Sequence, residues 1–171
     1  MKGYHPDIKP SDVSSLHVTV LVTLWNTAIT QKLCDSAYNT LLSEGFNKHQ
    51  VSVVEVPGCF ELPLSAKWAL KKSDAVIAIG CLIKGDTPHF EYIAQSCAWG
   101  LQQVSLEFSK PCIFGVLTVL NSADKTIPQT IYTKEVTTVD AHSKFWITVQ
   151  FDGTNANKLI LKVNYDDDTA T

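Results

Sequence analysis

An unbroken apolar run, residues 75–82, places the strongest constraint on how this chain can fold. It follows Asp74, ends at Leu82 and has the length of a β-strand. The polar residues that would alternate along a half-exposed strand are missing, as expected for a strand covered on both faces of a parallel sheet. The sequence therefore predicts an α/β fold in which helices cover the sheet.

The segment after this run combines turn residues, helix-start residues and a histidine. Gly85 is predicted to turn the backbone tightly, Thr87 to cap a helix and Pro88 to occupy its first position. Free N–H groups near Asp86 and Thr87 would then point outward at the positive end of the helix dipole and attract an anion. The alternative is an ordinary turn followed by a surface histidine, His89.

Strand and helix patterns alternate along the first two thirds of the chain. Strands are predicted at residues 16–24, 51–56, 74–82 and 111–119, and helices at residues 28–44, 60–72 and 88–109. On the last helix one apolar stripe recurs at helical spacing, formed by Ala94, Cys97, Leu101, Val104 and Phe108. This order predicts an open parallel sheet with right-handed crossovers, whose ligands bind beyond the carboxyl ends of the strands.

The composition favours one main domain, because 171 residues with 45% hydrophobic side chains can bury a single core. We divide the chain into an N-terminal arm at 1–15, an α/β domain at 16–120 and a divergent C-terminal segment at 121–171. The last segment carries β-type composition at residues 131–139, 145–151 and 158–165. Turn residues between the last two of these predict a hairpin.

Charge and hydropathy exclude several classes of protein. A net charge of −3 without a basic cluster argues against a nucleic-acid or acidic-membrane partner. No apolar run approaches the roughly 20 residues that span a bilayer. Residues 1–15 have no positively charged region leading into an apolar segment. We therefore expect a cytoplasmic protein that acts on small molecules or binds other proteins.

The five cysteines are widely separated, lie mostly among apolar residues and include no Cys-x-x-Cys pair. They are expected to be buried thiols in a reducing compartment. The five histidines are scattered, so no metal site is predicted. Three of the four tryptophans, Trp68, Trp99 and Trp146, are expected to be packing residues.

Four motifs carry a resemblance to a known family. They are Trp25-Asn26, the Val-Pro-Gly-Cys-Phe-Glu-Leu-Pro segment at 56–63, residues 80–90, and Phe-Gly-Val-Leu-Thr at 114–118. Over about residues 16–120 the chain resembles the 6,7-dimethyl-8-ribityllumazine synthases of riboflavin biosynthesis. The resemblance implies a flavodoxin-like sandwich with a four-stranded parallel sheet.

The same resemblance implies an activity and an assembly. These enzymes join 5-amino-6-(D-ribitylamino)uracil to 3,4-dihydroxy-2-butanone 4-phosphate and release phosphate and water, using no organic cofactor and no required metal. Their subunits form homopentamers, in some members packed into a 60-subunit shell, and each active site lies between neighbours.

The resemblance also implies a role for each candidate residue. Trp25 would stack on the pyrimidine, while Asn26 and Glu61 would hydrogen-bond the ribityl hydroxyls. His89 would shuttle protons, a task that suits an imidazole because it titrates near neutrality. Backbone groups of Gly58, Cys59, Leu82 and Ile83 would bind polar edges of the substrate. Gly85, Asp86 and Thr87 would form an anion-binding turn for the phosphate. Phe114 would complete the site from the adjacent subunit.

Three of these residues have plainer interpretations from the residues alone. Trp25 at a strand end and Phe114 in an apolar strand could belong to the core, and Glu61 beside Pro63 could serve only to start a helix.

The chain departs from the family after the fourth strand. The family continues with two helices, the first carrying an arginine that grips the substrate phosphate. Here all 14 basic residues are lysine, and Pro128 interrupts the expected helix. Lys84 or Lys125 could supply a point charge instead. Two functions therefore stay open: a lumazine synthase, or a non-catalytic homologue that binds a ribityl-pyrimidine or flavin-like ligand.

Overall fold

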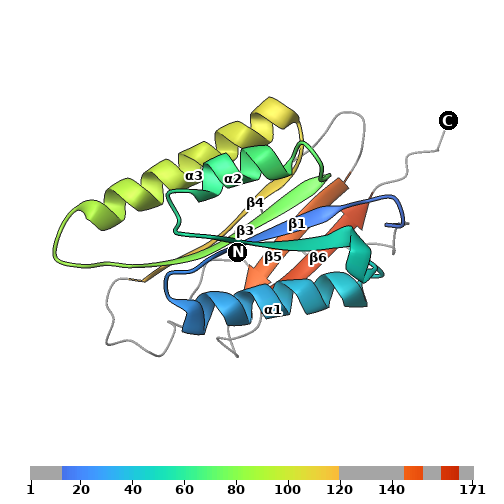
Figure 1. Cartoon of the computed structure of the whole chain (residues 1–171), viewed down its shortest axis with the longest axis horizontal. Helices are drawn as coiled ribbons and strands as arrows, with labels where there is room; N and C mark the ends of the chain where they lie inside the picture. The colour runs from blue at the N-terminus through green and yellow to red at the C-terminus, as the bar shows by residue number, and fades with distance from the viewer. Residues whose placement is uncertain (1–12, 120–144, 152–158, 166–171) are drawn as a thin grey trace, which may run out of the picture.

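The computed structural model describes residues 13–119, 145–151 and 159–165. Its first part is a four-stranded parallel sheet in the order β2-β1-β3-β4 (Figure 1). The elements are β1 (Val18–Thr23), α1 (Thr27–Ser43), the short 3-10 helix η1 (Lys48–Gln50), β2 (Val51–Val56), α2 (Leu62–Ala69), β3 (Ala75–Ile83), α3 (His89–Phe108), β4 (Cys112–Val119), β5 (Phe145–Phe151) and β6 (Leu159–Tyr165). The predicted α/β fold is confirmed.

Helices cover both faces of the sheet, as the apolar run at β3 predicts. On one face Ile77 and Ile79 of β3 pack with α1 residues such as Leu33 and Leu41. On the other face Val76 and Ala78 pack with residues of α2 and α3. Because successive side chains of a strand point to opposite faces, the alternation along β3 supplies both cores at once.

The core between the sheet, α2 and α3 confirms the predicted apolar stripe of α3. Its members Cys97, Leu101 and Val104 are buried, and Phe108 packs against them while half-buried. From α2 the buried residues Leu62 and Ala66 join the same cluster. Burying a leucine or methionine-sized side chain stabilises a fold by about 1.5–3 kcal/mol, so these contacts fix both helices on the sheet.

The predicted C-terminal hairpin is confirmed as an antiparallel pairing of β5 with β6. The bounds of β5 are those predicted, and β6 begins one residue later than predicted. This pair lies on the α1 side of the sheet, with β6 beside α1 and β5 beside β4 (Figure 1). The third predicted β segment, residues 131–139, and the arm at 1–12 lie outside the described residues.

Two details of the helix starts differ from prediction. The α3 helix begins at His89, its cap residue is Pro88, and no side chain caps it, so the predictions that Thr87 caps this helix and that Pro88 is its first residue are wrong. The α2 helix begins at Leu62, two residues after its predicted start, with Pro63 in the first turn as predicted. Helix ends are the least certain part of such predictions because a cap needs a specific side-chain geometry.

The contact between α2 and α3 yields a stability prediction. A Cβ added at Gly100 of α3 would lie 2.6 Å from Cγ and 2.7 Å from Cβ of Pro63. Alanine has the better helix propensity, by about 1 kcal/mol, but the rigid proline ring must move. We expect Gly100→Ala to lower the free energy of unfolding by about 1–3 kcal/mol, the usual cost of overpacking, measured by urea denaturation.

The matched control is Gly85→Ala, because a Cβ there meets nothing within 4 Å. Its unfolding midpoint should equal that of the wild type. An unchanged midpoint for Gly100→Ala would contradict the prediction and show that α2 can move away from α3 without cost.

Candidate active site at the carboxyl edge of the sheet

Three predicted site residues meet where β1 and β2 end. A Cβ built on Gly58 would lie 3.2 Å from Oε2 of Glu61 and 3.3 Å from Cδ1 of Trp25. The Trp25 side chain is 72% exposed, so the interpretation of this residue as core is wrong. Glu61 is the cap residue of α2 but makes no side-chain capping hydrogen bond. An indole face and a carboxylate are therefore available to a ligand beside a glycine.

Asn26 is held in the left-handed conformation, with φ 59° and ψ 42°. Its side-chain Nδ2 donates a hydrogen bond to the carbonyl oxygen of Cys81, at 3.0 Å. Its own carbonyl accepts from the N–H groups of Ile29 and Thr30, which begins α1. Asn26 thus joins the end of β1, the start of α1 and the end of β3, and its amide oxygen is the atom left to meet a ligand.

The thiols near this edge are buried and unsuited to nucleophilic chemistry. Burial raises the pKa of the Cys59 thiol to about 11, although a backbone hydrogen bond at Cys81 opposes the rise, and burial raises the pKa of Cys81 to about 11 as well. Protonated thiols are poor nucleophiles. A Cβ at Gly80 would lie 2.5 Å from the Cys59 Sγ, so Gly80 leaves the space that this thiol fills.

The predicted anion turn lies between β3 and α3. Leu82 and Ile83, the last residues of β3, are half-buried, and residues 84–89 are exposed. The φ of Gly85 is not in the left-handed region, so the segment does not use the positive φ that glycine adopts more easily than other residues. His89 is the first residue of α3 and exposes its imidazole on the same edge as Trp25.

Phe114 does not join the other site residues in this chain. It pairs with Ala78 near the amino end of β4, whereas Val119 pairs with Ile83 at the carboxyl edge. Val119 lies five positions further along β4 than Phe114, or roughly 16 Å at the usual rise. Phe114 is half-buried against the core beneath α2 and α3.

An ion pair that the sequence did not predict spans the turn. The ammonium of Lys84 contacts Oε1 of Glu91 and lies 6.0 Å from the centroid of the Phe90 ring. This hydrogen bond lowers the pKa of the Glu91 carboxyl. Lys84 precedes the turn and Glu91 follows His89, so two opposite charges flank this segment in the sequence. Residues seven positions apart come into contact here only because the turn folds between them, so the spacing alone did not predict the pair.

A family profile described as 6,7-dimethyl-8-ribityllumazine synthase matches residues 15–141. A protein of that name from Cytophaga hutchinsonii is 45% identical over 112 residues, which cover 64% of this chain and 70% of the relative. Another, from Parabacteroides distasonis, is 41% identical over 109 residues, which cover 63% of this chain and 68% of the relative. The chain belongs to the 6,7-dimethyl-8-ribityllumazine synthase family.

The sequence resemblance is thereby confirmed, and the profile match continues past residue 120 to residue 141. The profile and both relatives carry the name of the synthase and therefore support the condensation reaction of the family. Nothing in them favours the non-catalytic alternative. Within the described ranges no three His, Cys, Asp or Glu side chains gather in a way that could hold a metal ion. None of the described helices is long and apolar enough to cross a membrane.

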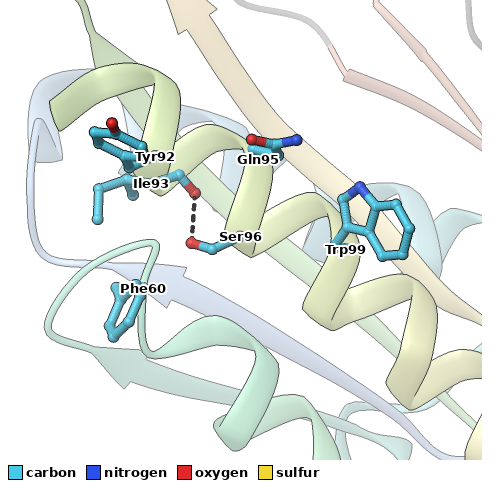
Figure 2. Close-up of a pocket in the computed structure, with 6 residues that line it drawn as sticks. All are labelled: Phe60, Tyr92, Ile93, Gln95, Ser96 and Trp99. Carbon is cyan, nitrogen blue, oxygen red and sulfur yellow. Dashed lines mark hydrogen bonds between the residues drawn. The ribbon is translucent and has the colours of Figure 1, made fainter. Parts of the chain in front are cut away.

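A hollow of about 540 Å³ lies beside α3 (Figure 2). Phe60, from the loop before α2, faces residues of α3 across it; the α3 residues are Tyr92, Ile93, Gln95, Ser96 and Trp99. Trp99 is 62% exposed and Trp68 of α2 is 61% exposed, so the expectation that both pack within the chain is wrong. The side chain of Trp146 lies outside the described set.

The strained position of Asn26 yields a second prediction. Asn26→Ala loses the hydrogen bond to Cys81 and also places alanine in the left-handed region, which costs about 1–2 kcal/mol. Asn26→Gly loses only the hydrogen bond, worth about 1 kcal/mol. We expect the alanine variant to be less stable than the glycine variant by about 1 kcal/mol in urea unfolding.

Ser109 is the matched control, because it is the other described non-glycine residue with a positive φ and lies at the far end of α3. Its alanine and glycine variants report the backbone strain alone. Equal stabilities of Asn26→Ala and Asn26→Gly would contradict the prediction.

Proposed function

We propose that this chain condenses 5-amino-6-(D-ribitylamino)uracil with 3,4-dihydroxy-2-butanone 4-phosphate to give 6,7-dimethyl-8-ribityllumazine, phosphate and water, at the carboxyl edge of its sheet. The observation that carries this proposal is that Trp25 and Glu61 meet beside Gly58, at the edge of the sheet where the β3–α3 turn leads to His89, in a chain of this family. Residues at this edge of a parallel sheet are well placed to bind ligands.

The pyrimidine substrate binds between the ends of β1, β2 and β3. The exposed indole of Trp25 stacks on the flat ring, and the Glu61 carboxylate accepts hydrogen bonds from ribityl hydroxyls. Gly58 leaves space between these two side chains. The remaining contacts are the amide oxygen of Asn26 and backbone groups of Cys59, Leu82 and Ile83.

The phosphate of the second substrate binds at the turn formed by Gly85, Asp86 and Thr87, just before α3. The first N–H groups of a helix have no carbonyl partner within it, and the positive end of the dipole favours an anion. The open space beside Gly85 supports a ligand there. His89, directly after the turn, accepts and returns protons as the amine adds to the ketone, phosphate leaves and the ring closes.

The proposed assembly is a homopentamer in which Phe114 reaches the site of a neighbouring subunit. Support comes from exposed apolar side chains on adjacent helices: Leu64 and Trp68 on α2, and Tyr92, Trp99 and Leu106 on α3. The α3 residues recur every seven positions and so share one face of the helix. A large exposed apolar face of this kind marks a protein interface. The five buried, unpaired thiols also support the proposed cytoplasmic location.

The reaction is tested by assaying the purified chain with both substrates and following the lumazine product by fluorescence against the uncatalysed condensation. We expect His89→Ala to slow turnover by roughly 10²- to 10⁴-fold, the usual contribution of a positioned acid-base group. The control is His49→Ala in η1, another exposed histidine, which precedes β2 at the opposite edge of the sheet. Equal rates for His89→Ala and wild type would remove His89 from the mechanism.

The assembly is tested by sedimentation velocity. Trp99→Glu places a charge on the exposed face of α3 and is expected to shift the wild-type pentamer to smaller species, because burying an unpaired carboxylate is unfavourable. Lys32→Glu, at an exposed position of α1, should leave the pentamer intact. A wild-type chain that sediments as a monomer at micromolar concentration would sink the pentamer proposal.

A further inference from the structure

Lys84, at the start of the proposed phosphate turn, combines a fixed backbone with an exposed charged side chain. Its backbone N–H donates to the carbonyl of Val119 at 2.8 Å, which ties the turn to the end of β4. Its side chain is 42% exposed, and the ammonium rests on Glu91 and beside the Phe90 ring. The backbone is therefore fixed while the charged group stays in contact with water.

The local charge balance makes this ammonium important. Between Lys84 and Glu91 the chain carries two carboxylates, Asp86 and Glu91, and one lysine. Among the described loops at the carboxyl edge, residues 24–26, 57–61 and 84–88, no other lysine or arginine is present. A phosphate that enters the turn would face both carboxylates, so its binding needs the Lys84 charge to be redirected.

We propose that Lys84 exchanges partners during the reaction, from Glu91 in the free enzyme to the phosphate of the bound substrate. This inference rests on the proposed function, because it concerns the phosphate-bearing substrate of the same site. In the free enzyme Glu91 holds the ammonium beside the turn. An exposed ion pair of this kind contributes little stability. A phosphate monoester carries more negative charge than a single carboxylate, so it attracts the ammonium more strongly than Glu91 does.

Partner exchange predicts that the two members of the pair act in opposite directions. Lys84→Gln removes the cation that the phosphate would bind, so phosphate affinity should fall by about tenfold to a hundredfold, as for loss of one charge-assisted contact. Glu91→Gln removes the competing carboxylate, so phosphate affinity should rise several-fold. If the ion pair only braced the turn, both variants would weaken phosphate binding.

The experiment uses the full chain and inorganic phosphate as the probe. Its dissociation constant is measured by calorimetry for wild type, Lys84→Gln, Lys84→Arg and Glu91→Gln, and each substrate's KM is measured beside it. We expect KM for the butanone phosphate to follow phosphate affinity while KM for the pyrimidine stays constant. Lys84→Arg should keep most of the affinity because it keeps the charge.

The chain offers a matched control ion pair. Lys67 of α2 contacts Glu107 of α3 at 2.9 Å, with side chains 44% and 52% exposed, near the far end of α3. Lys67→Gln and Glu107→Gln, compared in the same assembly state, should leave phosphate affinity unchanged.

Opposite shifts for Lys84→Gln and Glu91→Gln support the partner exchange, even if the wild type shows no turnover, which would overturn the proposed reaction alone. Shifts in the same direction, no shift from Lys84→Gln, or a wild type that does not bind phosphate would overturn the partner exchange. Turnover well above the uncatalysed rate, combined with any of these results, would leave the proposed reaction standing.

Discussion

Burial of β3 on both faces is the constraint on which the rest of this structure depends. From Ala75 to Cys81 the strand is buried, with alternate residues in the α1 core and in the α2/α3 core. A slip of one residue would exchange the two sets, and every side chain would meet the wrong helix. The register with β1 and β4 is thereby fixed, and the loops that follow the strands arrive together at one edge.

Three hydrogen bonds carry that order from the strands into the loops. The N–H of Leu24 donates to the Val56 carbonyl, Nδ2 of Asn26 to the Cys81 carbonyl, and the N–H of Lys84 to the Val119 carbonyl. Each bond ties a loop after one strand to the end of an adjacent strand. This arrangement explains how Trp25 can be both exposed and positioned, because its neighbours in sequence are anchored on either side.

The sequence predicted what depends on hydrophobic pattern. The four strands, their parallel pairing and the buried stripe of α3 follow from which residues avoid water, and the β5–β6 pairing follows from β-type composition with turn residues between the strands. Predictions from the sequence were wrong where they depended on one specific side-chain contact or backbone conformation. Thr87 does not cap α3, and the conformation of Gly85 does not require glycine. These residue types are common in turns and helix caps, which is why the sequence predicted those roles. The geometry of the turn, however, depends on how α3 packs on the sheet.

The exposed tryptophans show a different limit. The α3 helix carries two apolar stripes, and only the predicted one, containing Leu101, faces this chain's own core. The other, containing Trp99, is apolar yet exposed, and one chain's sequence cannot distinguish a residue buried by its own fold from one buried by a partner. Phe114, remote from its own site edge, poses the same problem. In the proposed pentamer one contact resolves both, because the neighbour that covers apolar surface also completes a site. In that pentamer a complete active site exists only while the subunits are associated. Dilution that separates the subunits then removes the assembly and the activity together.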